Sequence, residues 1–187
     1  QRVPEEYYAA VESSELRRIW APDNALWMIA MNAMAYPLDS VHLRRAIAFA
    51  VDKQAAVPAH LRDYVDVVDF ALPLSSEFSI ESEEGGLFYA SDLTSARNEL
   101  AMAGMLDVDD DGMVEAPNGD EVCLTIWAPV DETGFAASAE SISSCLLSIG
   151  INNSVVLLPH ETIQSELTRH NKTYNLALFE QVISPYD

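Results

Sequence analysis

The sequence predicts an α/β domain in which a mixed, largely parallel sheet is flanked by helices. From residue 122 onward, apolar strand-like runs alternate with helix-like periodicity in the order strand 122–128, helix 136–148, strand 151–158, helix 162–170 and strand 174–182. Such alternation is typical of βαβ units, whose parallel strands are covered by the connecting helices. With 187 residues, 49% of them hydrophobic, the chain is long enough for one well-packed core.

The first 120 residues supply further elements in order. Pro4 in a first turn predicts a helix over 3–12, two strands follow at 15–20 and 25–31, and 22–24 is a turn between them. A strong amphipathic helix should begin after Asp39-Ser40 and continue to residue 57, where Pro58 ends it. After an irregular stretch at 59–89, Ser91 or Asp92 should cap a helix over 93–103, and Gly104 should end it.

Charge and motifs exclude several classes of function. The net charge is −20, from 30 acidic and 10 basic residues, so binding to nucleic acid or to an anionic membrane surface is disfavoured. No apolar run reaches the roughly 20 residues of a membrane helix. The sequence contains no nucleophile elbow, phosphate-binding glycine loop, His-Glu-x-x-His or Cys-x-x-Cys motif. We therefore expect that the chain is not an enzyme.

Two smaller features leave alternatives open. Cys123 and Cys145 do not make a disulfide framework, and we expect two buried free thiols, although a bridge between a strand and the following helix stays open. The acidic loop 107–120 places oxygen ligands at Asp107, Asp109, Asp111 and Glu115, but Asn118 stands where a calcium loop would have a bidentate Glu. The loop is thus either a solvated turn, which we favour, or a structural Ca²⁺ site; no other cofactor is expected.

Several segments, in order along the chain, resemble the family 5 solute-binding proteins of ABC importers. Residues 32–53 read NAMAYPLDSVHLRRAIAFAVDK, similar to that family's Asn, Pro, Asp, Val-Arg-x-Ala-Leu helix and Ala-Ile-Asp-Arg end. Residues 96–104 (ARNELAMAG), 146–151 (LLSIGI) and 174–179 (YNLALF) match further family segments in the same order. Each piece alone is weak, whereas the ordered set is a strong signal.

The resemblance implies a fold and a function. It implies that 1–187 is a single lobe of the type II periplasmic-binding-protein class, with the first lobe and the C-terminal end missing. The two-lobed protein would close over an oligopeptide or other small solute by a hinge and deliver it to the permease subunits of an ABC transporter. We expect a monomer outside the cytoplasm, in the periplasm or as a cell-surface lipoprotein. The alternative is the same fold used as a sensory or regulatory ligand-binding domain.

The resemblance also implies where solute would bind. In relatives an acidic residue holds the peptide's amino terminus, with a Trp three positions earlier; a gap-free match of 174–179 puts Gln181 at the Trp position and Ser184 at the acid position. Asp187 falls on the family's Asp-Pro and could compensate for the lost acid. Peptide remains the default ligand from the resemblance, but this departure makes a different small solute credible.

Three further residues are candidates for ligand binding. Asn32 is expected at a strand end that faces the cleft, with turn capping as its alternative. Trp127, which a loop follows, is a better candidate for the cleft wall than Trp27. For Arg169 the resemblance implies the role, because in some relatives a basic residue near this point meets the ligand's carboxylate; its charge also suits the helix C-terminus, the role we favour.

Overall fold

The structure is a computed structural model that describes residues 25–72 and 87–182 of the chain. The helix predicted at 3–12, the strand predicted at 15–20 and the ligand positions Ser184 and Asp187 lie outside these described residues.

A four-stranded mixed sheet forms the centre of the described part, with strand order β1-β4-β2-β3. The strands are β1 (Ala25–Met31), β2 (Cys123–Pro129), β3 (Asn152–Leu158) and β4 (Leu176–Val182). β2 pairs in parallel with β3 and with β4, whereas β1 pairs antiparallel with β4. The predicted mixed, largely parallel sheet is therefore confirmed.

The sheet consists of two long ladders that meet over a short stretch. β1 and β4 pair along seven residues, and so do β2 and β3, but β2 and β4 share only Ile126↔Leu176 and Trp127↔Ala177. Next to this junction the Asn175 side chain accepts hydrogen bonds from the Thr125 backbone N–H (2.9 Å) and hydroxyl (3.0 Å). Asn175 thereby continues the contact to β2 where β4 has not yet begun.

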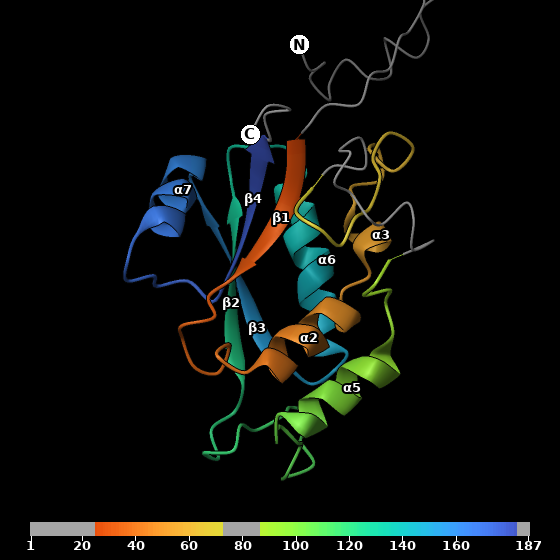
Figure 1. Ribbon diagram of the computed structural model, residues 1–187, viewed down its shortest axis with the longest axis vertical. Helices are drawn as coiled ribbons and strands as arrows, with labels where there is room; N and C mark the ends of the chain where they lie inside the picture. Colours follow the sequence, from red (N-terminus) through yellow and green to blue (C-terminus); the bar gives the residue numbers. More distant parts are fainter. Residues whose placement is uncertain (1–24, 73–86, 183–187) are drawn as a thin grey trace, which may run out of the picture.

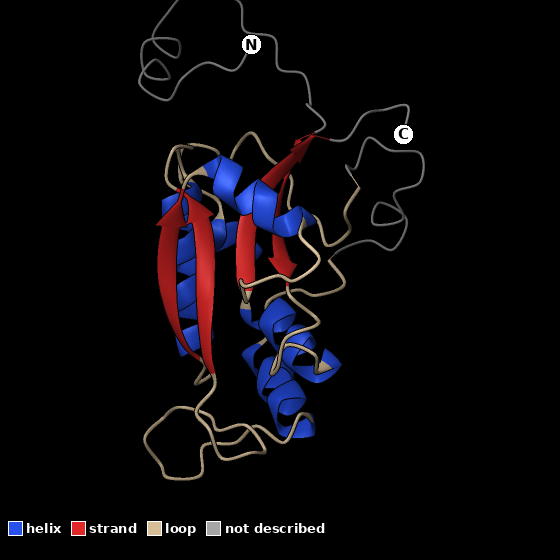
Figure 2. Ribbon diagram, turned by 90° about the vertical axis from the view of Figure 1, so that its left-hand side faces the viewer, coloured by secondary structure: helices blue, strands red, loops and turns tan. Residues whose placement is uncertain are grey.

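Helices cover both faces of the sheet (Figures 1 and 2). On one face α6 (Phe135–Leu147) packs on β2 and β3, and α2 (Val41–Ala50), α3 (Lys53–Ala56) and α5 (Leu93–Met102) lie beyond it; the smaller α7 (His160–Thr168) covers part of the other face. The main core lies between the sheet and the larger helical layer, with fully buried Ile47, Ile126 and Leu146 among its members. A second cluster of Ile163, Tyr174 and Ala177 lies under α7.

The helix predicted to run to residue 57 is interrupted, which corrects the sequence-based prediction. α2 ends at Ala50, Val51 and Asp52 are extended, and the Asp52 carboxylate accepts the Ala55 N–H at 3.0 Å to begin α3. Asp is a good N-cap and a poor residue for a helix interior, so its side chain starts a new helix here instead of continuing the old one. At α5 the capping residue is Asp92, whose carboxylate accepts the Thr94 N–H.

Cys123 and Cys145 are both free, and Cys123 is exposed where a buried thiol was expected. Partial desolvation of the sulfur, followed by the nearby Glu121 charge, raises the pKa of Cys123, which makes it a weak nucleophile. Among the described residues, no helix is long and apolar enough to span a membrane.

Candidate functional site

One edge of the sheet collects the features of a ligand site. The carboxyl ends of β2, β3 and β4 and the start of β1 all lie there, and the chain continues from this edge toward both termini (Figure 1). We call this the ligand edge and define it by residues 25–27, 129–134, 158–161 and 179–182. In open α/β sheets, ligands bind outside the carboxyl ends of the strands.

The loop after β2 is fixed to the start of α7 at this edge. The Val130 N–H donates to the Leu158 carbonyl at 2.9 Å, and the Asp131 carboxylate accepts the His160 N–H, also at 2.9 Å. The Glu132 carboxylate lies 2.5 Å from His160 Nδ1. The loop therefore presents a pre-organised polar surface, carrying two carboxylates and an imidazole, beside exposed Val130.

The N-terminus of α6 lies at the same edge. Its N-cap residue is a glycine, Gly134, and any other residue at this position would be strained. Gly134 is left-handed (φ 93°), and a Cβ there would lie 2.9 Å from the Pro58 ring and 3.0 Å from the Trp27 ring. Phe135, the first residue of the helix, stacks on Trp27 with ring centroids 4.0 Å apart. These contacts hold the helix end firmly against β1.

Trp27 also fixes a carboxylate of the ligand edge. Its indole N–H donates to Glu180 Oε2 at 3.0 Å across the β1–β4 ladder, where the two residues are direct partners. Trp27 therefore has structural contacts on both sides, with Phe135 and with Glu180.

The predicted binding residues differ in their distance from this edge. Gln181 is exposed one residue before the end of β4 and is part of the ligand edge. Trp127 lies two residues before the end of β2, half-buried against Tyr174 at a centroid distance of 6.1 Å and beside Ile163 of α7. Trp127 thus lies next to the edge, with its ring against the second cluster.

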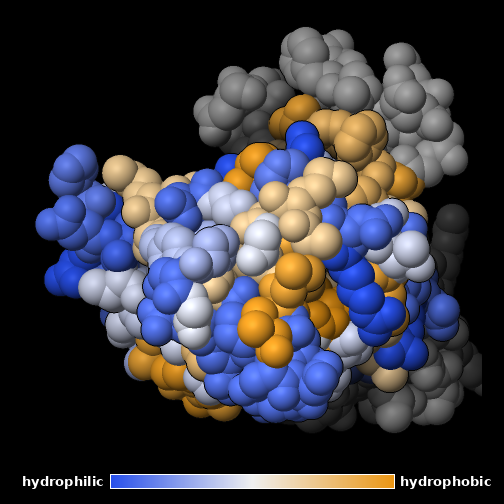
Figure 3. Space-filling model, turned by 90° about the horizontal axis from the view of Figure 1, so that it is seen from below, coloured by the Kyte–Doolittle hydropathy of each residue, from blue (hydrophilic) through white to orange (hydrophobic). Residues whose placement is uncertain are grey.

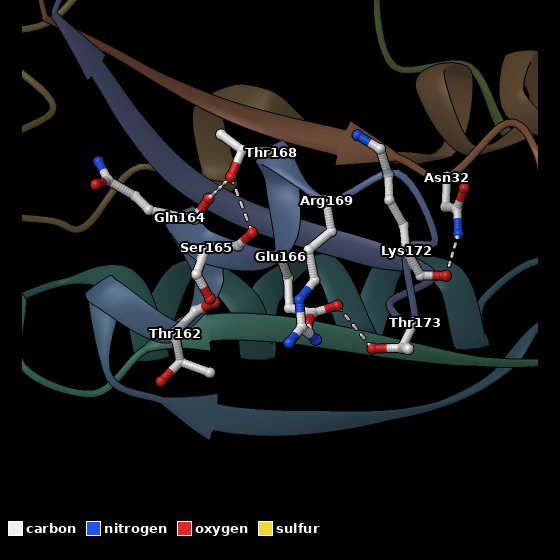
Figure 4. A network of polar contacts seen from close by, with 9 residues as sticks. All are labelled: Asn32, Thr162, Gln164, Ser165, Glu166, Thr168, Arg169, Lys172 and Thr173. Atoms are coloured by element: carbon white, nitrogen blue, oxygen red, sulfur yellow. Dashed lines mark hydrogen bonds and ion pairs between the residues drawn. The ribbon is translucent and has the colours of Figure 1, made fainter.

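Asn32 lies at the opposite edge of the sheet, because β1 runs antiparallel to the other strands. It is buried, and its side-chain amide donates to the carbonyls of Lys172 (3.3 Å) and Tyr174 (3.0 Å), as Figure 4 shows for Lys172. Its side-chain oxygen accepts the Met34 N–H at 3.3 Å. These contacts are those of the turn-capping alternative.

Arg169 belongs to the same network (Figure 4). It follows α7, roughly 13 Å of helix from the ligand edge at 1.5 Å per residue, and pairs with the buried Glu166. Glu166 also accepts the Thr173 hydroxyl at 2.9 Å. That hydrogen bond, followed by the Arg169 charge, outweighs burial and lowers the pKa of Glu166.

The acidic loop brings three of its four predicted ligands together. Carboxylate oxygens of Asp107, Asp109 and Glu115 lie within 4.8 Å of one another, and Asp111 is not among them. The same groups accept loop N–H groups: Asp107 from Gly112 at 2.9 Å and Glu115 from Val108 at 2.7 Å. The carboxylates therefore have backbone partners of their own.

Sequence reasoning missed the functional candidates Asp131, Glu132, His160 and Glu180. A usable signal existed for the first three, since they directly follow two of the predicted parallel strands. Glu180 could not be found in this way, because its role depends on the cross-strand pairing with Trp27.

Comparison with protein families shows which family the chain belongs to. All residues, 1–187, match the middle region of the bacterial extracellular solute-binding proteins, family 5. The chain therefore belongs to this family, and its sheet and helices have the fold of a lobe of the type II periplasmic binding proteins. Comparison with curated protein sequences finds no match.

Solved structures agree with the assignment. A periplasmic oligopeptide-binding protein of an ABC transporter from Thermotoga maritima is 26% identical, with a TM-score of 0.73 over 89% of this chain and 32% of that one, and a second structure of it holds mannohexaose. NikZ from Campylobacter jejuni, in complex with Ni(L-His), is 21% identical with a TM-score of 0.75, covering 95% and 34% of the two chains. The oligopeptide-binding protein AppA from Bacillus subtilis, bound to a nonapeptide, is 16% identical with a TM-score of 0.72, covering 99% and 36%. The chain thus spans about a third of the length of these proteins.

Proposed function

We propose that this chain is one ligand-binding lobe of an extracellular solute-binding protein that captures a small solute and delivers it to an ABC importer. The observation that carries this proposal is the ligand edge: the carboxyl ends of three parallel strands lie where the chain continues toward both termini. A second lobe attached there would face this edge, and solute would be enclosed between the two. Domain closure would then be a shift of population toward the state that encloses the solute.

The solute class is set by contacts at the ligand edge. Gln181 and, outside the described residues, Ser184 and Asp187 are the proposed contacts from the family match. Trp127, next to the edge, is proposed as a further contact because a loop follows it. The relatives give peptide as the default, but their solved complexes hold a nonapeptide, mannohexaose and Ni(L-His). This range supports testing peptides, oligosaccharides and metal chelates side by side.

The proposal includes no chemical step on the solute. The matched family and the related structures are binding proteins. Permease subunits of an importer would be the protein partners, and the full-length protein would act as a monomer outside the cytoplasm. The family's extracellular description supports that location.

A thermal-shift screen of the full-length protein tests the proposal. We expect one class among tripeptides to nonapeptides, mannohexaose and nickel–histidine to raise the unfolding midpoint. Solute at about 100 times its Kd should add about 2.7 kcal/mol of stability. If no member of the panel shifts the midpoint, the proposed function is wrong for these classes.

Two glutamine variants locate the binding. Gln181→Ala, at the ligand edge, should weaken binding of the stabilising solute by about 3- to 10-fold, in line with the loss of about 1 kcal/mol of hydrogen bonding. Gln164→Ala, an exposed residue on α7 away from the edge, is the matched control and should bind as the wild type does.

A further inference from the structure

A tight hairpin loop at the end of the acidic segment contains the only Asn-Gly pair of the sequence, Asn118-Gly119. The Ala116 N–H donates to the Asp120 carbonyl and the Gly119 N–H to the Ala116 carbonyl, both at 2.8 Å. Gly119 is left-handed (φ 85°), as the last residue of such a three-residue loop is expected to be. The loop lies at the end opposite the ligand edge, which Figure 3 views from below and which carries many hydrophilic side chains.

An asparagine followed by glycine can react with its own backbone. The glycine nitrogen, after losing its proton to solvent, attacks the asparagine side-chain carbon Cγ; the N–Cγ bond forms, the Cγ–Nδ2 bond breaks, and Nδ2 leaves as ammonia with that proton. The product is a five-membered succinimide ring, and one water molecule opens it at either carbonyl to give aspartate or isoaspartate. Glycine has no side chain to shield the attacking nitrogen, which makes this pair the most labile setting for a thermolabile residue.

The contacts of the Asn118 amide suit this reaction. Its Oδ1 accepts the Tyr36 hydroxyl, from the loop between β1 and α2, and the Asp120 N–H, both at 3.2 Å. That oxygen gains negative charge when the nitrogen adds to Cγ, and donors already in place stabilise such charge more than they stabilise the neutral amide. Nδ2 donates to Asp120 Oδ2 at 2.7 Å, so the two ends of the amide are oriented.

One contact opposes the reaction. The Gly119 N–H must leave the Ala116 carbonyl before its nitrogen can attack, and breaking one such hydrogen bond lowers the reactive population only about 2- to 10-fold. A Cβ at Gly119 would meet nothing within 4 Å, so no neighbouring group crowds the loop as it rearranges. The reaction is intramolecular apart from one water molecule, and it therefore requires no binding surface or partner.

Other asparagines in the described part are less suited to it. The side-chain amides of Asn32, Asn153 and Asn175 hold backbone groups at the sheet, and a residue with a side chain follows each of them. Asn171 is exposed in a bend after α7, but Lys172 follows it. Asn171 is thus the natural comparison for an accessible asparagine without a following glycine.

We propose that Asn118-Gly119 is a self-modification site, at which the folded protein converts Asn118 to aspartate and isoaspartate with release of ammonia. Conversion replaces the Nδ2 donor by a carboxylate oxygen beside the Asp120 carboxylate, and the two like charges repel each other. The hairpin that pairs Glu115 with Glu121 should then loosen. The proposal is independent of the solute-binding function.

The test incubates folded full-length protein in heavy-oxygen water at mildly alkaline pH and follows each asparagine by peptide mass spectrometry. Asn118 should gain one heavy oxygen about 10-fold faster than Asn171, because Lys172 shields the nitrogen that follows Asn171. Tyr36→Phe, which removes one donor to Oδ1, should slow conversion at Asn118 about 3- to 10-fold and leave Asn171 unchanged. Converted protein should show faster hydrogen exchange in the peptide covering 115–121.

A matched variant and two outcomes decide the result. Asn118→Gln keeps the amide but lengthens the side chain, so residue 118 should no longer convert while Asn171 converts as in the wild type. The proposal is overturned if Asn118 converts no faster than Asn171 in the folded protein. A Tyr36→Phe variant that converts at the wild-type rate or faster would show that the tyrosine contact does not promote the reaction, and would overturn the proposed role of the folded loop.

Discussion

At the scale of single residues, the carboxylate of Glu166 is a buried charge that hydrogen-bonding partners stabilise. It is buried at the end of α7, where Thr173 and Arg169 both donate to it. Through these contacts it fastens the segment that leads into β4, and Asn32 fastens the same segment from the other side. The network is thus structural and lies away from the ligand edge.

The lowered pKa of Glu166 predicts an acid-dependent contribution to stability. A group whose pKa is lower when folded stabilises the protein above its ordinary value, here 4.5, and loses that effect as the pH falls through its folded pKa. Glu166→Gln should therefore lose stability at pH 7 and show a shallower fall between about pH 4.5 and pH 3. Urea unfolding of wild type and variant at pH 7, 4.5 and 3 measures the free energy of unfolding. If that free energy falls equally steeply with pH in both proteins, the prediction is wrong.

A second residue-scale prediction concerns Gly134. Gly134→Ala combines a left-handed backbone with close contacts to Pro58 and Trp27, and should cost about 1–3 kcal/mol. The matched change Gly112→Ala has a similar φ of 93° but nothing within 4 Å of the new Cβ, so it should cost less. Thermal unfolding of the two variants separates strain from crowding; equal losses would mean that the contacts do not matter.

Residue roles were the least predictable part of the sequence. Asn32 was expected to face the cleft because it ends a strand, but a sequence pattern does not say which way that strand runs in the sheet. The antiparallel pairing of β1 with β4 places Asn32 at the far edge and Trp27 at the ligand edge. Strand direction is set by contacts with residues some 150 positions away, and no local signal contains it.

At the scale of elements, the alternation of strands and helices from residue 122 onward was predictable, because buried strands and amphipathic helices differ in period. All five predicted elements are present in the structure, with boundaries shifted by a few residues. The break between α2 and α3 was missed because the apolar pattern continues through it. Asp52 causes the break because its carboxylate accepts the Ala55 N–H and so begins a new helix. The spacing of apolar residues contains no information about this side-chain hydrogen bond.

The junction between β2 and β4 gives a prediction at this scale. Asn175→Ala removes the acceptor for both the Thr125 N–H and its hydroxyl, and an unpaired, partly buried N–H costs about 1–3 kcal/mol. Thr125→Val removes the hydroxyl alone and should cost less, about 1 kcal/mol. Chemical denaturation of both variants checks the order; a harmless Asn175→Ala would show that the two ladders hold together without it.

The acidic loop gives a second prediction at the scale of elements. Because its carboxylates accept backbone N–H groups, we expect the loop to keep its conformation as a solvated turn, and Ca²⁺ at about 10 mM, above the usual range for weak extracellular sites, should not raise the unfolding midpoint. Mg²⁺ at the same concentration controls for ionic strength. A Ca²⁺-specific rise that is lost in Asp109→Asn would instead establish the calcium alternative.

At the scale of the whole molecule, the ligand edge lies at one end of the described part and the acidic loop lies at the other (Figure 1). The core between them, from Leu43 on α2 to Ile126 on β2, is closely packed and buried. The family was recognisable from ordered sequence segments, whereas the residues that line the edge became visible only once the strands were paired.

Hydrogen exchange of the full-length protein, with and without the solute that stabilises it, tests the central claim most directly. The account predicts that solute slows exchange in the peptides covering 129–134, 158–161 and 179–182, and leaves the peptides covering 32–36 and 106–112 unchanged. Protection concentrated at 32–36 or 106–112, with none at the carboxyl ends of β2, β3 and β4, would contradict the assignment of the ligand edge.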